Sequence, residues 1–304
     1  MSAVFASGVR CNLDSLHQNL AVFNQRRLRP GLPTDDWNFR LHKDLKLQLM
    51  EGDYIESELQ EVRTELSEIP RDADAFIAWF ESLHDIGPGQ NDPLFSWLAD
   101  TANLEDMRWF LRQEVAGEAG FDDLVALTQL RLPNRAKLEL ARNYWDEMGR
   151  GHERGMHGPM LTRVSTELNL EPQVHSTVWE SLALANLMVG LAVNRRYAYH
   201  AIGALGVIEM TAPARVSHTN AGLKRLGVPA SARRYFQLHA GLDIQHSEAW
   251  NREVIRPLVA ANPELARPIA EGAWMRLQSG ARCFARYRRE LGVSENPRAA
   301  RTHS

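Results

Sequence analysis

Three side chains in the segment RRYFQLHAGLDIQHSEAW could bind a metal ion together. His239, Asp243 and His246 are separated by four and three residues, and an α-helix turns by about 100° per residue, so the three share one face. Two imidazoles and one carboxylate form a nitrogen and oxygen donor set that suits iron, manganese or zinc. A lone histidine would be explained as an exposed polar residue, but three such residues on one stripe predict a metal site.

A second group lies in the segment ARNYWDEMGRGHERGMHGPML. Glu147 and His157 are ten residues apart, which would place them about 80° apart on an ideal helix and suits a shared ligand role poorly. Glu153, one helical turn before His157, is an alternative to Glu147. A helix that unwinds or bends locally would change this geometry. The alternative is a plain loop between two helices. Glycines permit both, and the segment contains four of them: Gly149, Gly151, Gly155 and Gly158.

Two further carboxylates stand alone in apolar surroundings. Glu209 closes the apolar run HAIGALGVIEM just before Pro213, and a buried carboxylate is costly unless it is paired or binds a metal. The alternative is a glutamate at a helix end that reaches water. Glu118 lies in RWFLRQEVAGEAGFDDLVAL, where Glu114, one turn earlier, is an equal candidate to face the core.

The order of these residues resembles the haem-oxygenase-like diiron oxidases, also called the iron-containing redox enzyme family. In that family one helix supplies a Glu, the next a Glu and then a His, a later helix a Glu, and a helix near the end carries the pattern HxxxDxxH. The resemblance covers roughly residues 95 to 260 of this chain, and HxxxDxxH is its most specific part.

The resemblance implies a ligand set for two iron ions. One iron would be held by Glu118, His157 and His239, the other by Glu147, Asp243 and His246, with Glu209 bridging the ions or closing the site. Glu114 instead of Glu118, Glu153 instead of Glu147, and manganese instead of one iron stay open as alternatives. Some members carry a further Glu three residues before the histidine of the second helix, and this chain departs from that pattern with Arg154.

The resemblance also implies an O2-dependent oxidoreductase with a nonhaem diiron centre. It suggests N-oxygenation, desaturation or carbon–carbon cleavage of an amino acid, an amine or a fatty acid. Carboxylates and imidazoles hold Fe2+, tolerate Fe3+ and leave positions open for O2 as co-substrate. Electrons would come from an external donor or from the substrate, because the sequence has neither a GxGxxG fingerprint nor a cysteine cluster for an iron–sulfur centre.

The elements that must position these residues are helices. Apolar residues recur at three- and four-residue spacing in nearly every long segment, which predicts an all-α chain. The stretch GPGQNDP at 87–93 is the densest cluster of turn formers. We therefore expect an N-terminal helical region, residues 1–92, and a haem-oxygenase-like diiron-binding helical bundle, residues 93–304. The expected helices are roughly 12–28, 36–68, 72–85, 93–101, 104–130, 135–167, 175–192, 195–211, 215–226, 231–260 and 263–290.

Composition and charge limit the kinds of binding partner that we expect. With 304 residues, 44% hydrophobic and 24% charged, the chain has the composition of a soluble globular protein. Its formal net charge of -3 gives no electrostatic reason to expect nucleic acid or a membrane surface. Cys11 and Cys283 form no CxxC pattern, and the N-terminus lacks a signal peptide, so we expect a cytoplasmic protein. The expected partners are a small-molecule substrate and an external electron donor, with a homodimer left open.

Two other functions compete with the diiron oxidase. The first is a metal-free ligand-binding or hydrolytic protein of the thiaminase-like helical fold, which uses a cysteine nucleophile. Neither Cys11 nor Cys283 lies in a segment expected near the site, and activity retained after chelation would favour this function. The second is a noncatalytic interaction protein whose first 90 residues supply the partner surface, which would leave HxxxDxxH unexplained.

Overall fold

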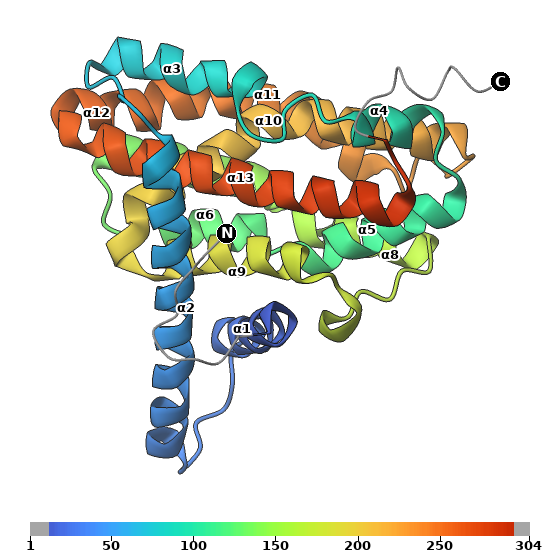
Figure 1. Ribbon diagram of the computed structural model, residues 1–304, viewed down its shortest axis with the longest axis horizontal. Coiled ribbons are helices and arrows are strands. Elements are labelled where there is room, and N and C mark those ends of the chain that lie inside the picture. The colour runs from blue at the N-terminus through green and yellow to red at the C-terminus, as the bar shows by residue number, and fades with distance from the viewer. Residues whose placement is uncertain (1–11, 295–304) are drawn as a thin grey trace.

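The computed structural model describes residues 12–294, and this part of the chain is almost entirely helical (Figure 1). It has no β-strand, only an isolated bridge between Met148 and Met156, so the all-α prediction is confirmed. Cys11 lies outside the described residues. The first seven α-helices are α1 (Leu13–Leu28), α2 (Trp37–Glu65), α3 (Ala73–Ile86), α4 (Pro93–Asp100), α5 (Leu104–Gly117), α6 (Phe121–Thr128) and α7 (Asn134–Glu147).

The second half of the chain contributes the remaining α-helices of the described residues. These are α8 (His157–Glu167), α9 (Trp179–Val193), α10 (Ala198–Arg225), α11 (Arg234–Trp250), α12 (Arg256–Ala261) and α13 (Ala266–Leu291). A π-helical turn at Asn251–Ile255 joins α11 to α12, and short 3-10 helices lie at Gly149–Gly151, Glu153–Gly155, Val174–Ser176, Arg195–Tyr197 and Pro263–Leu265. Within residues 12–294, no helix is both long and apolar enough to cross a bilayer.

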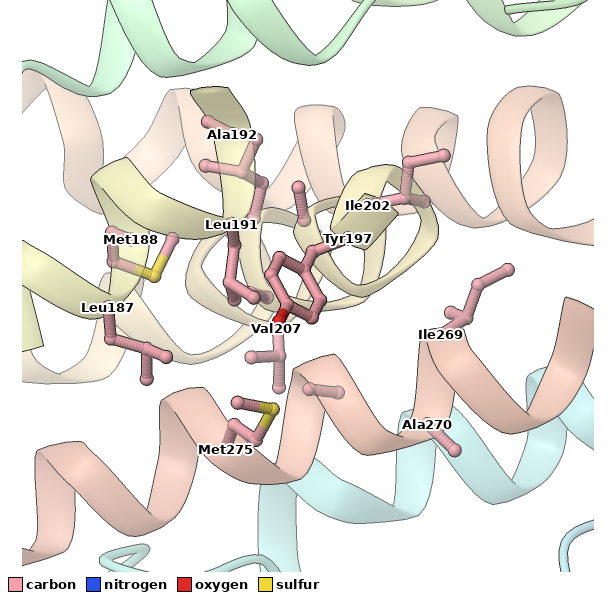
Figure 2. Close-up of a cluster of buried hydrophobic side chains, with 14 of the residues drawn as sticks. Leu187, Met188, Leu191, Ala192, Tyr197, Ile202, Val207, Ile269, Ala270 and Met275 are labelled. Carbon is pink, nitrogen blue, oxygen red and sulfur yellow. The ribbon is translucent and has the colours of Figure 1, made fainter. Parts of the chain in front are cut away.

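Helix α10 is the axis of the bundle, because it packs most extensively against α13 and α11. In Figure 1, α13 runs across the front with α9 below it, and α2 stands across the bundle with one half extending past it beside α1. Helix α9 is apolar on all sides, as expected for a buried helix. Figure 2 shows where α9, α10 and α13 meet, with Leu187, Met188, Leu191, Ala192, Ile202, Val207, Ile269, Ala270 and Met275 in one buried cluster.

The N-terminal helices share this cluster. Leu16 of α1, Tyr54 of α2 and Phe76 of α3 are buried in it together with residues of α9, α10 and α13. The Tyr54 hydroxyl donates a hydrogen bond of 3.0 Å to the Ala183 carbonyl of α9. The division of the chain at residue 92 stays a prediction.

Three of the expected helix boundaries were wrong. The expected helix 104–130 divides into α5 and α6, because Gly120 has a φ of 75°, a conformation that a helix interior excludes. The expected helix 135–167 also divides, at the glycines after Glu147. Conversely, α10 continues through Pro213, which was expected to end it. Proline costs a helix interior one hydrogen bond, here to the Glu209 carbonyl, and the packing of α10 outweighs that cost.

Two glycines allow α10 and α13 to approach closely. A Cβ at Gly203 would lie 1.9 Å from the Ile269 carbonyl oxygen, and one at Gly272 would lie 2.0 Å from the His200 carbonyl oxygen. Real Cβ atoms do not approach backbone atoms so closely, and neither backbone can move without opening the core.

We therefore expect Gly272→Ala to destabilise the fold. The added methyl forces the two helix backbones apart, which should lower the free energy of unfolding by about 1–3 kcal/mol. Chemical denaturation followed by circular dichroism measures this. The control is Gly52→Ala in α2, where a Cβ meets nothing within 4 Å, so it should be neutral or stabilising. Equal stability of the two variants would contradict the close-packing argument.

Candidate metal centre

The glycine-rich segment forms a tight loop that brings Glu147 to His157. Helix α7 ends at Glu147 and α8 begins at His157. Gly149, Arg150 and Gly151 between them have φ values of 61°, 52° and 84°, a left-handed conformation that glycine adopts most readily. The ends of the loop pair as the bridge from Met148 to Met156. As a result the His157 Nδ1 lies 3.0 Å from the Glu147 Oε2, which a straight helix would not allow.

The HxxxDxxH helix presents its three side chains inward, as its spacing predicts. His239, Asp243 and His246 of α11 are 5%, 4% and 1% exposed. The His239 Nδ1 donates to the Tyr235 carbonyl at 2.8 Å, which leaves its Nε2 facing the Glu147 Oε2 at 3.5 Å. The hydrogen bond to the Tyr235 carbonyl holds Nε2 towards Glu147, the orientation typical of a metal-binding histidine.

His246 is oriented in the same way but by a carboxylate. Its Nε2 lies 3.2 Å from the Asp146 Oδ2, so it donates there. Its Nδ1 then faces two other acids, at 3.5 Å from the Glu209 Oε2 and 3.8 Å from the Glu147 Oε1. This Nδ1 has no hydrogen-bond partner, and neither has the buried Oδ1 of Asp243. Unpartnered buried polar atoms are costly, and a cation between them would satisfy both.

Glu209 lies in the same cluster. It is 2% exposed in the middle of α10, so the alternative that it reaches water is wrong. Its Oε1 accepts a hydrogen bond of 2.6 Å from the Asn143 side chain of α7. The other oxygen faces His246. Such a carboxylate can act as a metal ligand whose orientation is fixed by the hydrogen bond from Asn143.

Glu118 lies at the edge of the cluster. It follows the last residue of α5, and its Oε1 accepts hydrogen bonds of 3.0 Å from the backbone N–H groups of Gly120 and Phe121. The same oxygen is 3.8 Å from the His157 Nε2. Glu114 instead accepts a hydrogen bond of 2.8 Å from the Tyr287 hydroxyl.

Within residues 12–294, two groups of side chains have ligand atoms within 4.8 Å of one another. One is Glu147, His157 and His239, and the other is Glu147, Asp243 and His246. Every member is buried, and Glu147 belongs to both. Glu153, the alternative to Glu147, is exposed and belongs to neither. The assignment of each residue as a ligand stays a prediction.

Three residues of the site were not identified from the sequence. Asp146 and Asn143 hold His246 and Glu209 from behind, and the Tyr235 ring packs on His157 and His239 with centroids 5.0 Å and 4.4 Å away. The spacing contained a signal for Tyr235, since it lies four residues before His239 on the same helix face. No comparable signal marked Asp146 or Asn143, because their partners lie on other helices.

The comparison with known families decides what kind of protein carries this site. The profile of the iron-containing redox enzymes matches residues 108–281, more than half of the chain. All seven predicted ligands lie inside the match. The chain belongs to the iron-containing redox enzyme family.

Solved structures show the same fold. A CADD-like protein of unknown function from Nostoc punctiforme PCC 73102, in a crystal structure at 2.00 Å, is 18% identical, with a TM-score of 0.56 over 73% of this chain and 99% of that one. A second crystal structure with the same description, at 1.35 Å, is 17% identical, with a TM-score of 0.54 over 74% of this chain and 97% of that one. No curated protein matches the chain. These likenesses establish the fold of this iron-containing redox enzyme.

The charges in the site are balanced by protons when no metal is present. Burial favours a neutral Glu147, but hydrogen bonds from His157 and His239 outweigh it and lower the Glu147 pKa. Burial also opposes protonation of His157, yet Glu147 and Glu118 raise its pKa to about 9. The Asp243 pKa rises to about 8 through burial and the neighbouring charge of Glu209. The close packing of the four acids Glu118, Glu147, Glu209 and Asp243 thus favours the binding of positive charge, here protons.

Metal binding should therefore release protons. Near pH 7 the raised pKa values leave His157, Asp243 and His246 protonated without metal, and a proton must leave each before it can act as a ligand. The apparent affinity for a divalent ion should rise about tenfold or more per pH unit between pH 6 and 8. Calorimetry in buffers of different ionisation enthalpy measures the released protons. An affinity independent of pH would contradict this charge balance.

Proposed function

We propose that this iron-containing redox enzyme is a nonhaem diiron oxidase or oxygenase that uses O2 to oxidise a small organic substrate. The observation that carries the proposal is the pair of buried donor groups that share Glu147. Donors of this type suit iron, and the unpartnered Asp243 Oδ1 and His246 Nδ1 indicate that a cation fits between them.

The proposed ligands divide into two sets. His157 and His239 would hold one ion, and Asp243 and His246 the other, with Glu147 shared between both. Glu118 and Glu209 would complete the sets from opposite sides, as their contacts to His157 and His246 suggest. A pair of iron ions held this way would supply redox electrons and a binding place for O2.

The protein supplies a shaped space beside these ligands. A pocket is lined by Glu147, His157, Glu209, His239 and Asp243, and also by apolar side chains. Leu184 and Met188 of α9 and Ile208 of α10 form part of this apolar wall. This wall would orient the apolar part of a substrate.

The alternative with a cysteine nucleophile has little support. Cys283 is buried in α13 among apolar residues, and burial raises the pKa of its thiol to about 12. A thiol with such a pKa holds its proton at neutral pH and is a poor nucleophile. It is also not among the residues that line the cavity.

Iron loading followed by exposure to O2 tests the proposal. The purified protein is loaded with Fe2+ without oxygen, desalted and analysed for iron, and we expect two ions per chain. An oxygen electrode should then record O2 uptake that depends on the bound iron.

The triple variant His239→Ala, Asp243→Ala and His246→Ala should lose both the iron and the uptake. His84→Ala, which changes an exposed histidine of α3, should keep both. Circular dichroism checks that each variant is folded. Absence of iron from the parent protein, or full iron content in the folded triple variant, would refute the proposal.

A further inference from the structure

The cavity beside the candidate metal centre continues into a second space. The two spaces share Glu114, Glu118 and Arg276 as lining residues, together with the apolar residues Leu184, Ile208, Ala212 and Val216. Of these two spaces, Arg215 of α10 lines the second and not the first. One continuous apolar passage therefore runs from the candidate ligands to two arginines.

Neither of these two arginines is paired with an acid. Within residues 12–294, neither guanidinium forms a hydrogen bond or a salt bridge, and the Arg276 Nε is buried without a hydrogen-bond partner. In this part of the chain the Arg215 guanidinium contacts only an aromatic face, 5.7 Å from the centre of the Phe284 ring. By contrast, other arginines in the bundle that are largely enclosed are paired, such as Arg27 with Glu51 and Arg282 with Glu58. A guanidinium carries five donors, so an unpaired one facing a cavity is an unfilled binding group.

No neighbouring acid among the described residues forms a salt bridge with either arginine. Burial, followed by the nearby charge of Arg276, lowers the Arg215 pKa to about 9, so Arg215 stays charged at neutral pH. Burial also lowers the Arg276 pKa. Glu114 is the acid that faces both, but it accepts its hydrogen bond from the Tyr287 hydroxyl and forms no salt bridge with either. Placing an anion between the guanidiniums would remove the repulsion and use their donors.

We infer that Arg215 and Arg276 bind the carboxylate of the substrate, with its apolar part lying along Leu184, Ile208 and Val216 towards the candidate metal centre. A carboxylate fits better than a phosphate because Glu114 and Glu118 already place negative charge in the cavity, which disfavours a dianion. An amine is disfavoured by the two cations. Binding of the carboxylate does not depend on the proposed function. Only oxidation of the bound molecule at the candidate metal centre rests on it.

Calorimetry on the metal-free protein tests the inference. The ligands are straight-chain carboxylates from butanoate to dodecanoate, apolar L-amino acids, alkylamines of the same lengths and an alkyl phosphate. We expect at least one carboxylate series to bind and the amines not to bind. Which carboxylates bind distinguishes a fatty acid from an amino acid as the source. Absence of binding by every carboxylate, or tighter binding by the amines or the phosphate, would overturn the inference.

Variants connect binding to the two arginines. Arg276→Met and, separately, Arg215→Met should weaken carboxylate binding about tenfold or more, as loss of a charged hydrogen bond does. The affinity of Arg276→Lys for the carboxylate should lie between those of the parent and Arg276→Met, since lysine keeps the charge but cannot donate two parallel hydrogen bonds. Arg71→Met, at an arginine that is 71% exposed, should bind as the parent does.

Thermal unfolding confirms that each variant is folded before its affinity is read, and unchanged affinity in the folded Met variants would overturn the inference. Because binding is measured without metal, its failure leaves iron loading and O2 uptake unaffected. Conversely, a chain that binds carboxylates but no iron would refute the proposed function alone.

Discussion

Glu147→Gln is expected to prevent loading of both metal ions. Glu147 belongs to both donor groups, so the substitution removes a charged oxygen donor from each at once. It also leaves His157 and His239 beside an uncharged amide, although the carboxylate contacts both, at 3.0 Å and 3.5 Å. Loss of a direct ligand should exceed the roughly 10- to 100-fold effect of changing an outer residue. We expect less than one ion per chain and no measurable O2 uptake.

Metal analysis after desalting measures the effect. Glu153→Gln is the control, because Glu153 is exposed on the same loop and should leave the metal content at two ions per chain. The opposite result, with Glu153→Gln losing metal and Glu147→Gln keeping it, would show that the wrong carboxylate has been assigned.

Asp146→Asn should lower the metal affinity about 10- to 100-fold without removing any ligand. Asp146 accepts from the His246 Nε2 at 3.2 Å and is itself held by Arg150 of the glycine loop at 2.7 Å. Its charge keeps the imidazole oriented with Nδ1 towards Glu147 and Glu209 and makes that nitrogen a stronger donor. An asparagine has no charge, and its amide can turn its own donor towards the ring.

A titration of the variant with Co2+, followed by its visible absorbance, gives the affinity. Glu139→Gln is the matched control. Glu139 and Asp146 both form a salt bridge with Arg142 of α7, but Glu139 does not contact His246. Its affinity should equal that of the parent. Equal affinities for Asp146→Asn and Glu139→Gln would mean that Asp146 does not position His246.

The sequence predicted best what depends on the periodicity of one helix. HxxxDxxH needs only a regular helix to place three side chains on one face, and α11 provides it. The all-α fold follows from the same periodicity and the family from the resemblance of the residue order, and both are confirmed. The order of the acids and imidazoles could be matched to the family because order does not depend on how the helices pack.

What depends on backbone conformation could not be predicted. The approach of Glu147 to His157 requires left-handed residues, and Arg150 adopts one although it is not a glycine. The continuation of α10 through Pro213 depends on packing with α13, which overrides the local signal. Which side of the uniformly apolar α9 faces the cavity has no periodic signal, since burial on all sides removes the polar face.

Diffraction at the iron absorption edge, from crystals loaded with Fe2+ without oxygen, would locate the metal ions. Two anomalous peaks are expected in the pocket. The Glu147 carboxylate should contact both, with His157 and His239 on one side and Asp243 and His246 on the other. A single peak, or iron bound away from Glu147, would contradict the proposed diiron centre.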